Sequence, residues 1–173
     1  MSHEHAQGRA WVFGDDVDTD LLAPGAYMKG PFEALASHCL EALDPTFAQQ
    51  VQAGDIVVAG ENFGIGSSRE QAAQALVHLG ISTVLARSFG GIFFRNALNL
   101  GLVALTCPDS GQIRSGHRLA VDAAVGVVDN LSTGERYTCN RLPARLLDMV
   151  RDGGLVAHLE KRYPTGKPEQ DPG

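Results

Sequence analysis

The stretch Gly60–Gln71, GENFGIGSSREQ, indicates the fold of this chain, because it joins an expected strand to an expected helix. The run Ile56–Ala59 before it is short and wholly apolar, which suits a strand buried on both faces. The segment Ser67–Leu79 after it has apolar residues spaced for one face of a helix. A loop between such a strand and helix lies at the carboxyl edge of an open α/β sheet, where ligands collect. We therefore expect an α/β fold with its site at this loop.

Strands and helices alternate on either side of the loop. The expected strands are Gly8–Gly14, Thr83–Ala86 and Leu102–Leu105, and the expected helices are Pro31–Leu43 and Ile92–Leu100. Connections this short predict a parallel βαβ core with right-handed crossovers. From Arg118 to Cys139 apolar and polar residues alternate, which predicts antiparallel strands, and helices over 143–151 and up to Tyr163 follow. We expect one domain over residues 8–163, with flexible ends at 1–7 and 164–173.

Composition excludes several classes of protein. The 173 residues carry a formal net charge of −6, whereas a nucleic-acid-binding protein normally shows a basic face. No apolar run is long enough to cross a membrane, so we expect a cytoplasmic protein. Cys39, Cys107 and Cys139 are widely spaced and form no CxxC pair, which makes them poor ligands for an iron–sulfur cluster. We expect this chain to bind no metal itself.

The loop offers donors suited to an anion. Ser67, Ser68 and Arg69 present hydroxyls and a guanidinium near the expected start of a helix, whose backbone N–H groups attract negative charge. An alternative is structural, because Ser67 with Glu70, or Ser68 with Gln71, matches the spacing of a helix-capping box. The loop is neither a P-loop, since no lysine follows the second glycine, nor a dinucleotide fingerprint, since Arg69 replaces the third glycine.

Two further stretches carry charge close to glycines. Gly14–Gly25, GDDVDTDLLAPG, spaces Asp16, Asp18 and Asp20 as a calcium loop would, but the glycine and glutamate of an EF-hand are missing. It is either a solvated acidic turn or a segment in which one aspartate orients a cationic group. In Ala86–Gly101, ARSFGGIFFRNALNLG, the two arginines add cationic character, while the apolar residues suit a core.

The order and spacing of these three blocks resemble the swivel domain of aconitases and the free-standing small subunit of 3-isopropylmalate dehydratase. The likeness runs from about Gly8 to Tyr163, nearly the whole chain. A chain with this domain alone resembles the small subunit and not the fused aconitase. The resemblance implies a hydro-lyase that removes water from a malate-like acid and, in the isomerases, returns it at the neighbouring carbon.

The resemblance also implies roles for particular residues. Ser67 is similar to the base that removes a proton from carbon next to a carboxylate. Ser68 and Arg69 would hold a substrate carboxylate, and Asp20 would support the assembled site. The resemblance implies that a partner large subunit carries a [4Fe–4S] cluster. A partner of this kind is consistent with the chemistry, since hydroxide is a poor leaving group that needs a Lewis acid and this chain has no evident ligand set. The chain is therefore expected to be inactive alone, with a small di- or tricarboxylic acid as substrate of the assembled enzyme.

Lys29 is the candidate for reading the variable end of the substrate. In the family, the loop matching Ala26–Gly30 meets that end, with an apolar residue in isopropylmalate enzymes and an arginine in homoaconitate enzymes. Lys29 would meet a polar or carboxylate group there, and Met28 would line a pocket for a small alkyl group. The alternative is that Lys29 is a solvated loop lysine.

The sequence departs from the family pattern at Ile65, where many small subunits have cysteine, and at Gln71, where histidine is usual. Isopropylmalate, the substrate of leucine biosynthesis, is the first candidate, and homoaconitate and dimethylmalate are alternatives. A non-enzymatic anion-binding module of the same fold is a second hypothesis. A serine hydrolase using His78 or His117 is disfavoured, because the nucleophile-elbow motif is absent.

Overall fold

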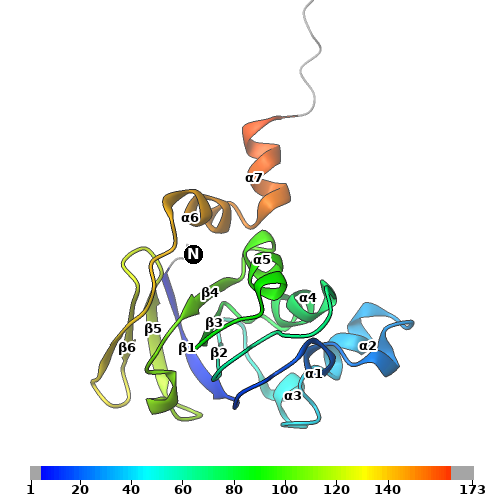
Figure 1. Cartoon of the computed structure of the whole chain (residues 1–173), viewed down its shortest axis with the longest axis horizontal. Helices are drawn as coiled ribbons and strands as arrows, with labels where there is room; N and C mark the ends of the chain where they lie inside the picture. The colour runs from blue at the N-terminus through cyan, green and yellow to red at the C-terminus, as the bar shows by residue number, and fades with distance from the viewer. Residues whose placement is uncertain (1–4, 165–173) are drawn as a thin grey trace, which may run out of the picture.

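The computed structural model describes residues 5–164, and these fold around one seven-stranded mixed sheet (Figure 1). The strands lie in the order β4-β3-β2-β1-β5-β6-β7. Their bounds are β1 His5–Val12, β2 Ile56–Val58, β3 Thr83–Ala86, β4 Val103–Thr106, β5 Arg118–Asp122, β6 Val127–Asn130 and β7 Arg136–Thr138. The expected α/β class, with a parallel core and added antiparallel strands, is confirmed. Of the ends expected to be flexible, 1–7 and 164–173, residues 1–4 and 165–173 lie outside the described residues. Residues 5–7 are instead part of β1 and pair with β5.

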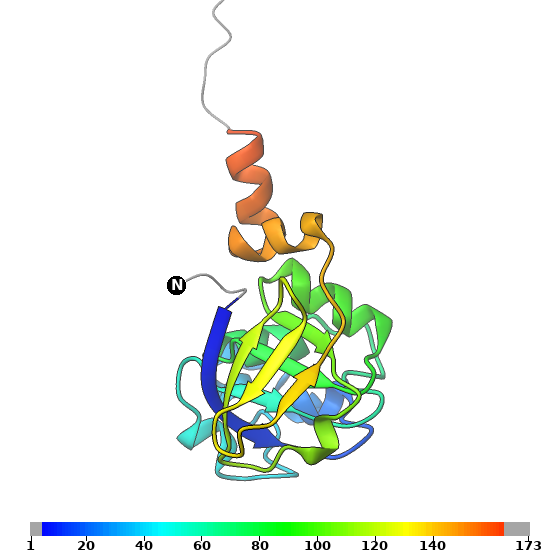
Figure 2. The same ribbon diagram turned by 90° about the vertical axis from the view of Figure 1, so that its left-hand side faces the viewer.

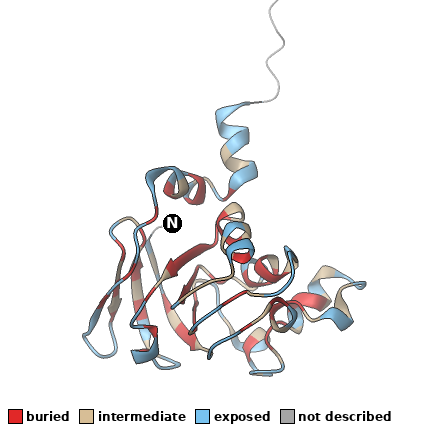
Figure 3. Ribbon diagram, in the orientation of Figure 1, coloured by how far each residue is buried: buried red, intermediate tan, exposed pale blue. Residues whose placement is uncertain are grey.

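β1 joins the two halves of the sheet. Its carboxyl half pairs in parallel with β2, with Trp11 opposite Val57, and its amino half pairs antiparallel with β5, with Ala6 opposite Val121. This second pairing explains why the strand begins at His5 and not at Gly8. Figure 2 shows the antiparallel strands curling away from the parallel ones. The central strands β2 and β3 are buried on both faces, as their sequences IVV and TVLA, apolar except for Thr83, indicate (Figure 3).

Helices pack against the parallel strands and over the curled antiparallel part of this sheet. Their bounds are α1 Thr19–Leu22, α2 Phe32–Ser37, α3 Phe47–Gln50, α4 Gln71–His78, α5 Gly91–Asn99, α6 Ala144–Arg151 and α7 Leu155–Arg162. One buried cluster lies between the parallel strands and α1–α5, and the other lies inside the curl beneath α6. None of the helices in the described part of the chain is long and apolar enough to span a membrane.

Two helices are shorter than predicted. The helix expected from Ser67 begins at Gln71, and the helix expected to reach Leu43 ends at Ser37. Leu40 has a positive φ of 59°, which a right-handed helix does not allow, and its N–H donates to the Leu21 carbonyl at 2.9 Å. Ser67 lies in the loop before α4, where its N–H donates to Thr19 Oγ1.

Candidate active site

The loops after β1 and β2 lie side by side at the carboxyl edge of the parallel strands. Three backbone hydrogen bonds of 2.7–2.9 Å join them: Asp16 N to Glu61 O, Gly64 N to Val17 O, and Thr19 N to Ile65 O. The loop after β3 joins the same edge through a bridge between Phe63 and Phe89. The acidic block, the GSSR block and the start of the third block are therefore neighbours in space.

Two glycines allow this close approach. Gly66 has φ +118°, and a Cβ there would lie 2.9 Å from Thr19 Oγ1. Gly64 has φ +80°, and a Cβ there would lie 2.2 Å from the Phe93 ring. Both positions combine a left-handed backbone with no room for a side chain, which explains the glycine spacing in the motif.

Ser67 is held by a residue that the sequence analysis missed. Its Oγ lies 3.1 Å from Thr19 Oγ1, and its N–H donates to the same oxygen at 3.1 Å. Thr19 is only 4% exposed and begins α1, whose first turn is capped by the Asp18 carboxylate accepting from Leu21 N–H at 2.8 Å. The only feature of the sequence that could have pointed to Thr19 was its hydroxyl group, between Asp18 and Asp20.

The capping interpretation of the serines is wrong. The residue before α4 is Glu70, which makes no side-chain capping hydrogen bond. Ser67 is engaged with Thr19, and Ser68 makes no hydrogen bond among residues 5–164. Both serines are exposed. Their hydroxyls are therefore presented outward on the edge of the sheet.

Arg69 is oriented by Asp20. Its Nη1 donates to Asp20 Oδ1 at 3.2 Å and to the Ala23 carbonyl at 2.7 Å. Asp20 Oδ1 also accepts from Gly25 N–H at 2.9 Å. That backbone donor first, and the guanidinium second, lower the pKa of Asp20. In the described chain Arg69 Nε and Nη2 make no hydrogen bond, so this edge of the guanidinium is available for a carboxylate.

The other aspartates of the acidic block have structural partners. Asp18 caps α1, and Asp16 Oδ1 accepts from Asn62 Nδ2 at 3.0 Å. Residues 5–164 contain no group of three or more histidines, cysteines or carboxylates placed to hold a metal ion. Of the arginines in the third block, Arg87 faces Glu61 at 3.7 Å and Arg95 is exposed.

Lys29 and Met28 follow the short 3₁₀ helix Gly25–Tyr27. Lys29 is exposed and has no hydrogen-bond or ion-pair partner in the part of the chain that the structure describes. Met28 is partly buried against the core cluster around α1–α5, so most of its side chain is committed to packing. Of the two, Lys29 is free to meet another molecule.

Comparison with known protein families shows which class of domain carries these loops. Residues 32–110 match the family model described as the aconitase C-terminal domain. Residues 32–110, which include the GSSR loop, therefore carry an aconitase-type domain.

Its relatives define the family more closely. It is 46% identical to the 3-isopropylmalate dehydratase small subunit of Heliobacterium modesticaldum, over 92% of this chain and 98% of that protein. It is 44% identical to a methanogen homoaconitase small subunit of Methanothermobacter thermautotrophicus, over 92% and 94%. A crystal structure of 3-isopropylmalate dehydratase from Methanocaldococcus jannaschii, 40% identical, superposes with a TM-score of 0.86 over 91% of this chain and 95% of that one. The chain belongs to the family of 3-isopropylmalate dehydratase small subunits.

Proposed function

We propose that this chain is the small subunit of a heteromeric hydro-lyase acting on 3-isopropylmalate or a closely related acid, with Ser67 as the base. One observation carries the assignment of the site. Ser67, Ser68 and Arg69 stand together on one exposed edge, and a buried threonine and an aspartate fix the first and the last of them.

Ser67 would remove a proton from the substrate carbon beside a carboxylate. Its alkoxide takes that proton, the double bond forms, and hydroxide leaves the neighbouring carbon. A serine alkoxide is strongly disfavoured in water, so donors aimed at the oxygen are needed. If the Thr19 hydroxyl donates to Ser67 Oγ across the 3.1 Å contact, it stabilises the alkoxide directly.

Arg69 and Ser68 would hold a substrate carboxylate. The Arg69 Nη1 is occupied by Asp20 and Ala23, which leaves a planar edge of Nε and Nη2 for a bidentate contact. Ser68 stands one residue from this edge and its hydroxyl is exposed. A carboxylate held there would lie near the base, as removal of the adjacent proton requires.

A large subunit would complete the site. Ser67 is exposed in this chain, whereas an alkoxide needs a dry, positively charged pocket, so the missing walls must come from another molecule. The cysteines of this chain do not fit a cluster, because all three are buried within its own core. The cluster that the family uses would belong to the large subunit and would assist departure of the hydroxide.

Substrate choice would depend on Lys29. The relatives named for 3-isopropylmalate favour an alkyl-substituted malate, and a place in leucine biosynthesis follows from that name. The homoaconitase relative, together with an exposed ammonium at Lys29, supports a second candidate with a third carboxylate.

The test is Ser67→Ala in enzyme assembled anaerobically with the cognate large subunit. We expect kcat to fall by about 10²–10⁴-fold, the usual contribution of a general base, with little change in KM. Ser110→Ala, which removes a buried serine hydroxyl bonded to the Ala59 carbonyl, serves as the control for nonspecific effects. Near-normal turnover by Ser67→Ala would show that Ser67 is not the base.

A further inference from the structure

The carboxyl-terminal helix α7 projects from the body of the domain (Figure 1), and its residues are exposed or half-buried (Figure 3). None of its residues is buried. Leu155, Val156, Leu159 and Tyr163 are 37%, 68%, 44% and 68% exposed. At 100° per residue Leu155, Val156 and Leu159 fall within an arc of roughly 100° on one side of the helix axis, and Tyr163 follows the last residue of the helix. An amphipathic helix normally buries such a face, so this one lacks its counterpart.

The helix is nevertheless held firmly at its base. A Cβ on Gly154 would lie 2.4 Å from the Asn99 carbonyl oxygen, and one on Gly101 would lie 2.9 Å from the Gly153 carbonyl carbon. The bend between α6 and α7 therefore packs backbone to backbone against the end of α5. Only glycines permit this contact, so the direction in which α7 leaves the domain is fixed by packing.

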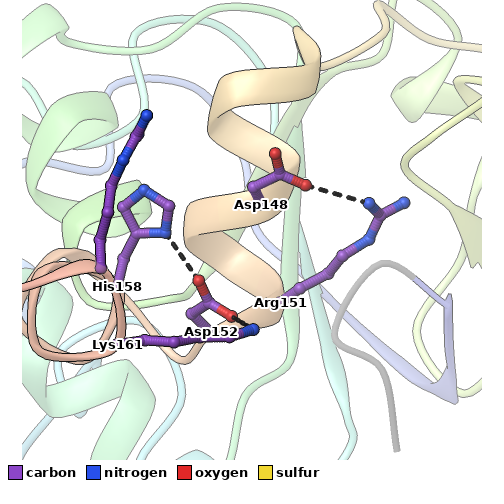
Figure 4. A pocket seen from close by; sticks show the side chains of 6 residues that line it. Asp148, Arg151, Asp152, His158 and Lys161 are labelled. Carbon is purple, nitrogen blue, oxygen red and sulfur yellow. Dashed lines mark hydrogen bonds and ion pairs between the residues drawn. The ribbon is translucent and has the colours of Figure 1, made fainter.

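A charged cluster fixes the side of α7 next to its apolar face (Figure 4). Asp152, at the end of α6, lies 2.7 Å from His158 Nδ1 and accepts from Lys161 Nζ at 3.0 Å. The Asp152 and His158 side chains are only 14% and 18% exposed. Contact with His158 first, and with Lys161 second, lowers the pKa of Asp152. These contacts orient the helix but leave its apolar side uncovered.

A groove connects the apolar face of α7 with the residue next to the candidate active site. Leu155 and Val156 form one wall of a groove of about 210 Å³, whose other lining residues are Glu70, Asn96, Asn99 and Leu100. Glu70 directly follows Arg69 in the chain. A molecule that lies over Ser67–Arg69 can therefore continue along this groove onto α7 without leaving the surface.

We propose that the apolar face of α7, with the groove beside it, is a docking surface for the large subunit. The inference rests on the proposed function, which requires a second molecule over Ser67. Residues 165–173, TGKPEQDPG, contain no large apolar side chain that would complement this face. Continuity with the site favours the partner that completes the site over a second copy of the chain.

The experiment measures the dissociation constant between the full-length small subunit and its cognate large subunit. Val156→Asp and Leu159→Asp place a charge on the exposed face, and each should weaken the complex by about tenfold or more, as expected for anchor positions of an interface. Leu131→Asp is the matched control, because Leu131 is 53% exposed at the turn after β6, and it should change the affinity by less than about twofold. Circular dichroism and Tm of each variant report whether the domain has folded.

A kinetic readout separates docking from chemistry. At saturating large subunit the α7 variants should recover wild-type kcat, whereas Ser67→Ala should bind normally and lose about 10²–10⁴-fold in kcat. Unchanged affinity of both folded α7 variants overturns the docking inference and leaves the proposed function standing. Full turnover by Ser67→Ala overturns the assignment of Ser67 as the base and does not affect the docking inference. Self-association of the isolated chain that Leu159→Asp abolishes, with unchanged affinity for the large subunit, would assign the face to a second copy instead.

Discussion

Replacing Thr19 by valine tests whether this buried threonine activates Ser67. Valine keeps the shape of threonine and removes only the hydroxyl, which contacts both Oγ and the N–H of Ser67 at 3.1 Å. A hydrogen bond to a charged group contributes about 1.5–3 kcal/mol, so its loss from the alkoxide should lower kcat by about 10- to 150-fold. KM should change little, because Thr19 does not reach substrate carboxylate in the proposed arrangement.

The assay is steady-state hydration and dehydration with reconstituted enzyme, over a range of pH. Thr19→Ser retains the hydroxyl and should recover most of the lost kcat, which a purely steric role of Thr19 would not explain. The kcat profile of Thr19→Val should also shift toward higher pH, because a less stabilised alkoxide forms at higher pH. The reasoning fails if folded Thr19→Val keeps wild-type kcat while Ser67→Ala loses it.

Three further predictions concern the charged residues of the site. Arg69→Lys should raise KM by roughly tenfold or more, since lysine cannot provide the planar pair of donors, and an unchanged KM would show that Arg69 does not bind substrate. Lys29→Val should lower kcat/KM for acids with a third carboxylate by about 10-fold or more and spare alkyl-substituted malates, whereas equal losses would show that Lys29 does not read the variable group. The lowered pKa of Asp20 means that its contacts with Gly25 and Arg69 stabilise the fold above the ordinary carboxyl pKa, and that this contribution is lost as pH falls through the lowered value. Asp20→Asn should therefore flatten the acid side of the Tm-versus-pH curve, and parallel curves for the two proteins would contradict this.

Much of the fold followed from local sequence patterns. Thr83–Ala86 was predicted and observed with identical bounds, and the antiparallel strands appeared within Arg118–Cys139 as expected. The GSSR loop was correctly placed between a strand and a helix at the carboxyl edge of the sheet. These features are readable because the periodicity of apolar residues and the positions of glycines act over a few residues. The family resemblance rested on the same blocks.

Tertiary structure alone decided which residues within those blocks meet. The contacts of Ser67 with Thr19 and of Arg69 with Asp20 join residues 48 and 49 positions apart. No local pattern encodes them, because they depend on how the loops after β1 and β2 align once both strands are paired. The helix expected from Ser67 begins only at Gln71, and Ser67 instead lies in a loop, where its N–H donates to Thr19 on the neighbouring loop. The orientation of α7 likewise depends on glycine backbones and an ion-paired aspartate meeting in space, whereas the sequence showed only that a helix would form there.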